Sequence, residues 1–104
     1  MESPVLIRRS PRRERFTIVA NDSARDPRLS LRARGLLVTL LSLPDGWQTS
    51  TLAISRDVRE GRDAVRVAAR ELEEAGYLMR EKRPNEKGQW TTTWTLFDES
   101  QIPL

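Results

Sequence analysis

The run EGRDAVRVAARELEEAGY, residues 60–77, carries two periodic patterns at once, and the rest of the fold can be worked out from it. Its apolar residues recur at spacings of three and four, which places them on one side of an α-helix. They are Val65, Ala68, Leu72 and Ala75. Gly76 follows at the position where a helix commonly ends in a residue that tolerates positive φ. The run therefore predicts a helix with one buried face.

Arginines form a second stripe on the same run. Arg62, Arg66 and Arg70 recur every four residues, and Arg59 stands just ahead of them. Alanines on the inner side would let another helix approach closely. A narrow helix with an arginine face suits insertion into the DNA major groove. A surface helix whose arginines are only solvated would show the same pattern, so both interpretations stay open at this point.

Two more helices are predicted upstream of this run. Ser30 is a good N-cap for a helix over residues 31–43, whose leucines form a broad core face. Thr49 or Ser50 caps a short helix that reaches about Asp57. Two helices joined by a few residues, with glycine in the joint, form the helix-turn-helix pattern.

After Gly76 the pattern changes from a period of 3.6 to a period of two. Two strands, residues 77–83 and 89–97, are predicted on either side of a turn, and their β-branched and aromatic content suits a pleated sheet. Trp94 and Leu96 are expected in the core. The position of Trp90, near the tip, is left open between burial and exposure.

Shorter segments complete the predicted domain. Alternation over residues 15–20 predicts a short half-buried strand with its apolar side chains on one side. They are Phe16, Ile18 and Ala20. Residues 21–28 are expected to form a loop, and Trp47 is expected to fill a gap between two helices. The domain then spans residues 15–98, between a basic arm of residues 1–14 and a short tail of residues 99–104.

The composition argues against catalysis. The chain has 104 residues, the size of a single domain, and contains neither cysteine nor histidine. The commonest nucleophile–base pairs and zinc sites therefore cannot be assembled, and no enzyme activity, metal or cofactor is predicted. No apolar run approaches the roughly 20 residues that span a bilayer, and the amino terminus does not resemble a secretory signal. A cytoplasmic, nucleoid-associated protein with no membrane partner is expected.

The net charge of +3 is unevenly distributed along the chain. Residues 1–36 carry nine arginines against four acids, whereas residues 71–104 carry four cations against seven acids. The basic character therefore lies in the amino-terminal half and in the predicted helix of residues 60–77. This distribution favours a directed contact with a polyanion.

The order strand, helix, short helix, third helix and hairpin is that of a winged helix-turn-helix, an α+β fold. Three runs, LSLRARGLLVTLLSLPDGW, EGRDAVRVAARELEEAGYL and NEKGQW, resemble the winged-helix domains of phage and plasmid replication proteins. These are replisome organisers and primosomal proteins of the DnaD-like type, with related stand-alone helix-turn-helix proteins of bacteria and their phages. The resemblance covers roughly residues 16–97, and its most specific parts are EGRDAV and ELEEAGYL.

The resemblance implies sequence-specific binding to double-stranded DNA, by a transcriptional regulator or a replication accessory factor. In such domains the third helix enters the major groove and the hairpin, or wing, lies against the backbone or minor groove. The implied contacts are Arg62, Asp63, Arg66 and Arg70 in the groove and Lys87 at the wing tip. Arg59, Ser50 and Thr51, beside the helix-turn-helix, and Arg12 and Arg13, in the arm, complete the candidate DNA-binding residues.

Two further partners are compatible with the sequence. A winged helix usually covers one half-site, so a homodimer would be natural. Val67 stands where the family pattern is often small and polar, which suits either a thymine methyl or a protein partner. The alternative function is therefore an adaptor module that binds a polymerase or a replisome component.

Overall fold

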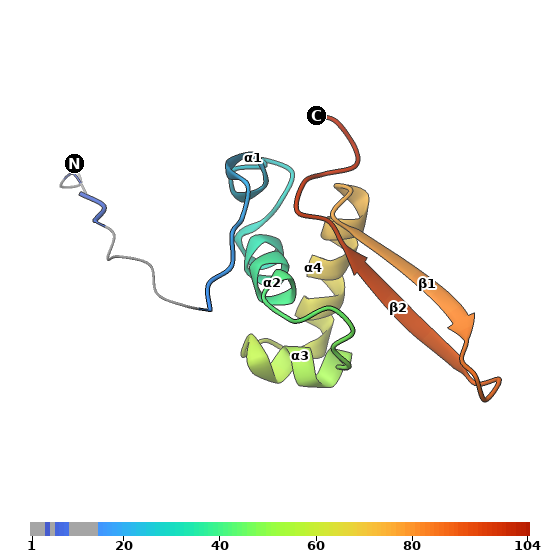
Figure 1. The fold of residues 1–104 in the computed structure, drawn as a ribbon. Helices are drawn as coiled ribbons and strands as arrows, with labels where there is room; N and C mark the ends of the chain where they lie inside the picture. Colours follow the sequence, from blue (N-terminus) through green and yellow to red (C-terminus); the bar gives the residue numbers. More distant parts are fainter. Residues whose placement is uncertain (1–3, 5, 9–14) are drawn as a thin grey trace.

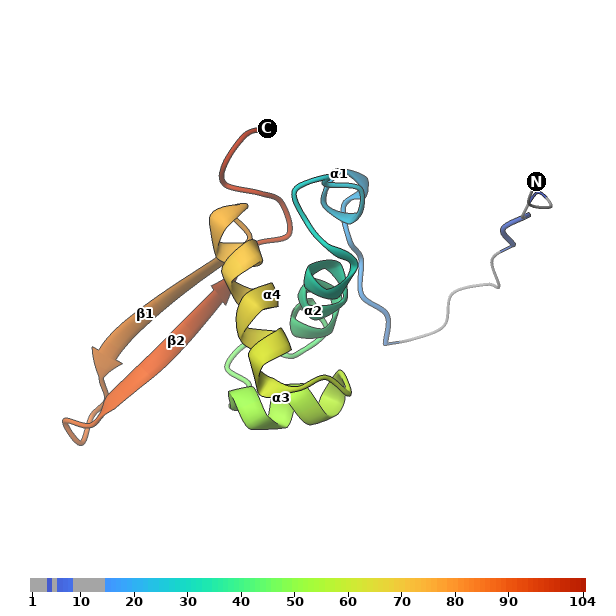
Figure 2. The ribbon, with the colours of Figure 1, turned by 180° about the vertical axis from the view of Figure 1, so that it is seen from behind.

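The computed structural model describes residue 4, residues 6–8 and residues 15–104. This part of the chain contains four helices followed by a two-stranded antiparallel hairpin. The elements are α1 (Asn21–Ala24), α2 (Leu31–Leu41), α3 (Thr51–Asp57), α4 (Arg62–Glu74), β1 (Leu78–Pro84) and β2 (Trp90–Leu96). In Figures 1 and 2, α4 lies between α2 and the hairpin, and α3 lies across one end of both helices. The fold is thus a mixed α and β fold with the hairpin after the helices, as the sequence predicted.

The core lies between α2, α3 and α4. Its buried apolar residues are Leu29, Ala33, Leu36, Leu37, Leu40, Ile54, Val65, Ala68, Ala69, Leu72, Ala75, Tyr77 and Leu78. The predicted inner face of α4 is therefore confirmed. Small side chains at Ala33, Ala68 and Ala69 are fully or almost fully buried, which lets helix backbones approach one another closely.

The start of α2 is held by a cap that α4 completes. The Ser30 hydroxyl accepts a hydrogen bond from the backbone N–H of Ala33 at 3.1 Å, as its predicted N-cap role requires. The Glu71 carboxylate, on α4, accepts hydrogen bonds from the Ser30 hydroxyl and backbone N–H, each at 2.8 Å. One cap therefore fixes the relative position of the two longest helices.

A buried carboxylate anchors the end of α4. Asp26, only 3 % exposed, accepts a hydrogen bond from the Tyr77 hydroxyl at 2.7 Å and an ion-paired hydrogen bond from Arg28, also at 2.7 Å. The Arg28 guanidinium holds the pKa of Asp26 well below its usual range, against the opposing effect of burial, and the Tyr77 hydroxyl adds to this lowering. Burial, followed by the Asp26 carboxylate, raises the pKa of Tyr77. The phenol therefore stays protonated and keeps donating its hydrogen bond.

The carboxy-terminal segment packs against the end of α4. Gly76 has φ +86°, so the predicted glycine at the helix end is confirmed. Its carbonyl accepts a hydrogen bond from the N–H of Gln101 at 2.9 Å. A Cβ at position 76 would lie 2.7 Å from the backbone nitrogen of Ile102, closer than side-chain carbons come. The segment predicted as a tail is thus held to the domain at a site that only glycine fits.

The hairpin follows the predicted strands closely. β1 and β2 pair from Leu78 opposite Leu96 at the base to Pro84 opposite Trp90 at the tip. Trp94 and Leu96 pack against the core, as predicted. Trp90 is 73 % exposed, which resolves the open position at the tip. The hairpin projects away from the helices beyond its base (Figure 1).

The predicted strand over residues 15–20 is wrong, and so is the loop predicted to follow it. Residues 15–20 form no strand, and Phe16 and Ile18 are 57 % and 68 % exposed. A strand needs a partner, and in the part of the chain described the sheet consists of β1 and β2 alone. Residues 21–24 of the predicted loop instead form α1, where the buried Ser23 hydroxyl donates a hydrogen bond to the carbonyl of Asp98.

The predicted burial of Trp47 is also wrong, because its side chain is 61 % exposed. α2 ends at Leu41, and the partly buried Leu41 and Leu43 pack against the core at this end of the helix. A turn then directs the chain outward. In it Gly46 has φ +80° and the N–H of Trp47 donates to the carbonyl of Pro44 at 3.1 Å.

Candidate nucleic-acid interface

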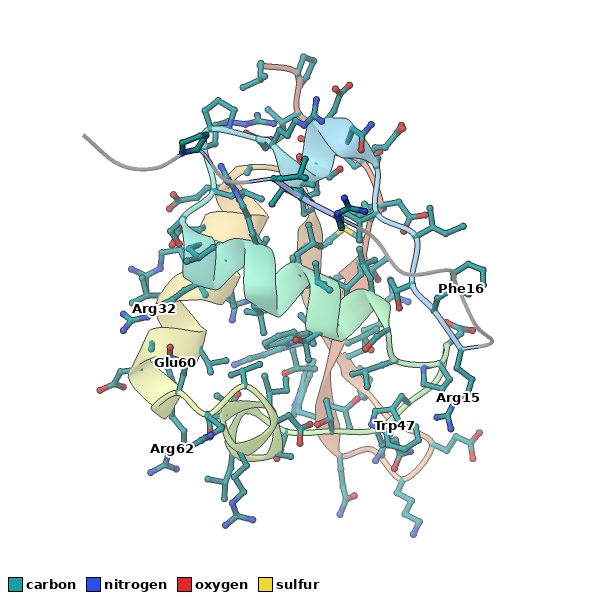
Figure 3. All side chains as sticks on the ribbon, turned by 90° about the vertical axis from the view of Figure 1, so that its left-hand side faces the viewer. Arg15, Phe16, Arg32, Trp47, Glu60 and Arg62 are labelled. Atoms are coloured by element: carbon teal, nitrogen blue, oxygen red, sulfur yellow. The ribbon has the colours of Figure 1, made fainter. Side chains whose placement is uncertain are left out.

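The outer face of α4 carries the predicted arginine stripe. Arg62, Arg66 and Arg70 are all exposed, and Val67 lies among them with 59 % of its surface exposed. Figure 3 shows the Arg62 side chain directed away from the helices. The helix begins after Gly61, which offers no side-chain cap. The first-turn N–H groups and the positive end of the helix dipole are therefore left to solvent or an anion.

One arginine of the stripe already has an acidic neighbour. The Arg66 guanidinium donates a hydrogen bond to the Asp63 carboxylate at 3.0 Å, across three residues of α4. Their side chains are 60 % and 97 % exposed, so the pair is well solvated. Exposed pairs of this kind contribute only about 0–1 kcal/mol. Arg66 can therefore exchange Asp63 for a stronger anion at little cost.

The turn between α3 and α4 orients the start of the helix. The predicted joint of a few residues between the two helices is confirmed at residues 58–61, and its left-handed residue is Arg59, with φ 55°, rather than a glycine. The N–H of Glu60 donates to the carbonyl of Ser55 at 3.0 Å, and its carboxylate lies 3.4 Å from the Arg32 guanidinium of α2. This contact, visible in Figure 3, ties the turn to α2. Arg59 itself is exposed beside the arginine stripe.

Two predicted contact residues stand at the start of α3. The Ser50 hydroxyl accepts a hydrogen bond from the N–H of Ala53 at 3.1 Å, which settles the choice of cap between Thr49 and Ser50. Thr51 is half-buried in the first turn. Ser50 therefore has a structural role in α3, and a contact of Ser50 or Thr51 with DNA stays a prediction.

The hairpin ends in a turn that the Asn85 side chain holds in shape. The Asn85 side-chain oxygen accepts hydrogen bonds from the N–H groups of Lys87 and Gln89, both at 2.9 Å. Gly88 supplies the positive φ, +76°, that the turn requires. The Lys87 side chain is exposed at this tip. A cation is therefore presented on an ordered projection from the domain.

A second cation links the base of the hairpin to α4. The Arg80 guanidinium pairs with the Glu73 carboxylate and lies 5.4 Å from the centre of the Trp94 ring. Arg80 was not among the residues predicted from the sequence. The hairpin register could have identified it, because the register places Arg80 directly opposite Trp94. A cation opposite an indole on a neighbouring strand commonly contacts the ring.

Apart from Ser50 and Thr51 at the start of α3, the described sequence-predicted residues fall into two groups, and the contact of each with DNA stays a prediction. Arg62, Asp63, Arg66 and Arg70 share the outer face of α4, next to Arg59. Lys87 stands apart from them at the hairpin tip. Arg12 and Arg13 lie outside the described residues, and their contact with DNA remains a prediction.

No protein-family model, curated protein or solved structure matches the chain. The resemblance to phage and plasmid replication proteins therefore stays a prediction. Within residue 4, residues 6–8 and residues 15–104, no group of side chains could hold a metal ion. The same part of the chain contains no helix that is long and apolar enough to cross a bilayer.

Proposed function

We propose that this chain is a winged helix-turn-helix protein that binds double-stranded DNA in a sequence-specific manner, as a transcriptional regulator or a replication accessory factor. One observation carries the proposal. α4 buries one face in the core and carries three exposed arginines on the other, and a projecting hairpin follows it. In this proposal α3 and α4 form the helix-turn-helix, and β1 and β2 form the wing.

The dimensions of α4 fit the major groove. Its 13 residues extend over about 20 Å at the rise of an α-helix. Arg62 stands in the first turn, where a recognition helix comes closest to the bases, and a guanidinium can donate two hydrogen bonds to guanine. Arg70, two turns later, is placed for a phosphate contact that fixes the register of the helix.

The solvated pair of Asp63 and Arg66 gives the helix a second way to read sequence. When Arg66 moves to a phosphate, the Asp63 carboxylate is released in the first turn of α4. A carboxylate there can accept a hydrogen bond from the amino group of cytosine or adenine, and the acceptor atoms of guanine and thymine repel it. Arg62 and Asp63 together therefore favour a guanine close to a base that presents an amino group in the major groove.

The hairpin is long enough to reach a neighbouring part of the duplex. Each strand has seven residues, which extend over about 23 Å. With α4 in the major groove, the tip would bring Lys87 to the adjacent backbone or minor groove. A second copy of the chain on a symmetric site would double these contacts.

The test is a titration of labelled, mixed genomic duplex DNA at several salt concentrations. The parent protein should bind with a strong salt dependence, because each phosphate contact releases condensed counterions. Arg62→Ala/Arg70→Ala should weaken binding and lower the slope of log K against log salt. The matched control, Arg15→Ala/Arg25→Ala, removes the same charge from exposed positions away from α4 and should bind like the parent (Figure 3 shows Arg15 and Arg62 on opposite sides).

The adaptor alternative makes the opposite prediction for this titration. An adaptor would show no salt-sensitive retention of DNA, and both double variants would behave like the parent. An equal loss of affinity in both double variants would indicate a general electrostatic attraction with no role for α4. Either result would overturn the proposal.

A further inference from the structure

The face of the hairpin that packs on the core at its base continues outward as an exposed surface. Side chains alternate along a strand, so Leu96, Trp94, Thr92 and Trp90 of β2 share this face. The register places four residues of β1 opposite them: Leu78, Arg80, Lys82 and Pro84. Near the base of the hairpin this face packs on the core through Leu78, Trp94 and Leu96. Nearer the tip, Lys82, Trp90 and Thr92 are exposed.

Two tryptophans on this one face have opposite surroundings. Trp94 is partly buried against the core, and the Arg80 guanidinium lies over its ring. Trp90, two positions closer to the tip, is 73 % exposed and has no cation–π contact in the described part of the chain. Burying a large aromatic side chain stabilises a fold by roughly 1.5–3 kcal/mol. At Trp90 the domain forgoes most of that gain, so the fold does not account for an indole at this position.

The side chains next to Trp90 are of types that commonly contact nucleic acid. Lys82 forms no ion pair among the residues that the structure describes, and with Thr92 it borders a shallow depression beside the indole. An indole plane can stack on a base, and a lysine attracts the adjacent phosphate. A threonine hydroxyl can donate a hydrogen bond to a phosphate oxygen. An unpaired base, unlike a base inside a duplex, has a free face on which the indole can stack.

We propose that Trp90, with Lys82 and Thr92 beside it, is a stacking site for an unpaired DNA base, and that the protein binds most tightly where a duplex adjoins a single strand. This inference rests on the proposed binding of α4 to duplex DNA. α4 holds the duplex, and the projecting hairpin carries the indole past the helices to the point where the strands separate. The indole then takes the place of the neighbouring base in the stack, as aromatic side chains do in single-strand binding proteins.

The experiment compares two labelled DNAs at one salt concentration: a blunt duplex and the same duplex with a single-stranded extension at one end. The parent should bind the extended DNA more tightly. Trp90→Ala should lower affinity for the extended DNA by roughly five- to a hundredfold, the effect of losing one stacked base. Its affinity for the blunt duplex should change little, so the ratio of the two affinities falls towards one.

Three variants separate stacking from a structural role. Trp90→Phe keeps an aromatic plane and should retain most of the preference. Trp47→Ala removes another exposed indole, from the loop before α3, and should leave the ratio unchanged. Lys82→Ala should weaken binding to the extended DNA more than to the blunt duplex. A hairpin merely loosened by the loss of Trp90 would bind both DNAs more weakly and keep their ratio.

The outcomes also separate this inference from the function on which it rests. A parent that binds both DNAs equally, or a Trp90→Ala variant that keeps the parent's preference, would overturn the stacking site and leave duplex binding intact. The exposed indole would then belong to a contact with a protein. A parent that binds neither DNA would overturn duplex binding itself.

Discussion

The inner and outer faces of α4 belong to one helix but differ in burial, charge and side-chain size. The inner face consists of small and medium apolar side chains that are at most 3 % exposed: Val65, Ala68, Ala69 and Leu72. The outer face carries three exposed arginines and Val67, which is 59 % exposed. The inner face holds the helix in place through apolar packing, and the outer arginines take no part in that packing. A helix built in this way can change its outer residues with little effect on stability.

The hairpin repeats this division along its length. Its base joins the core through Leu78, Trp94 and Leu96, and its tip projects with Trp90 exposed. The residues outside the core include arginines on α4 and Lys82, Lys87 and Trp90 on the hairpin. These are the residue types that contact phosphates and bases. The comparison therefore predicts that stability and DNA binding respond to different sets of substitutions.

The largest effect is expected on the inner face. Leu72 has no exposed surface, so Leu72→Ala should lower the free energy of unfolding by about 2–5 kcal/mol through lost burial and the cavity left behind. Urea denaturation followed by circular dichroism measures the change. Val67→Ala, on the outer face of the same helix, is the matched control and should stay within about 0.5 kcal/mol of the parent. Similar losses in the two variants would remove the distinction between the faces.

A smaller effect is expected where a polar network replaces apolar packing at the end of α4. Asp26→Asn removes the charge that accepts hydrogen bonds from Arg28 and Tyr77, and should lower the free energy of unfolding by about 1–3 kcal/mol. Asp22→Asn, at an exposed position of α1, is the control and should change stability little.

The same carboxylate predicts how stability depends on pH. Because folding lowers the pKa of Asp26, its contribution is fully present above the unfolded value of about 3.9 and is lost as the pH falls through the folded value. The parent should therefore lose stability in acid more steeply than Asp26→Asn, as measured by urea midpoints between neutral pH and strong acid. Parallel pH profiles would show that Asp26 is not held by Arg28 in solution.

The sequence predicted the parts of this fold that repeat a local pattern. The apolar period identified the inner face of α4, and the change to a period of two identified both strands within one or two residues. Glycine at position 76 marked the helix end. These features depend on neighbours in sequence, so a periodic pattern is enough to find them.

The errors occurred where distant segments decide the outcome. The alternation of residues 15–20 met no partner strand, and the turn after α2 leaves Trp47 exposed. The network of Asp26, Arg28 and Tyr77 joins residues about 50 positions apart, and no local pattern announces it. In the candidate interface, the sequence identified the arginine stripe. The exposure of Trp90 and the contact of Arg80 with Trp94 needed the register of the hairpin.

Effects on binding, with little change in stability, are expected within the outer face itself, where the roles of two arginines can be separated. Arg66 is proposed to contact a phosphate, so Arg66→Ala should weaken binding to all duplex sequences alike and lower the slope of log K against log salt by about 0.9. Its loss of affinity should be modest, because a contact between an exposed guanidinium and a single anion contributes little in water. Arg62 is proposed to read guanine. Arg62→Ala should therefore reduce the difference in binding free energy between the best and the poorest DNA sites by about 1–3 kcal/mol. Selection from a random duplex pool, followed by titration of the best and poorest sites at several salt concentrations, measures both quantities. If both variants lower the slope and keep the same site preference, then both arginines contact phosphates, and the sequence is read elsewhere on α4 or on the hairpin.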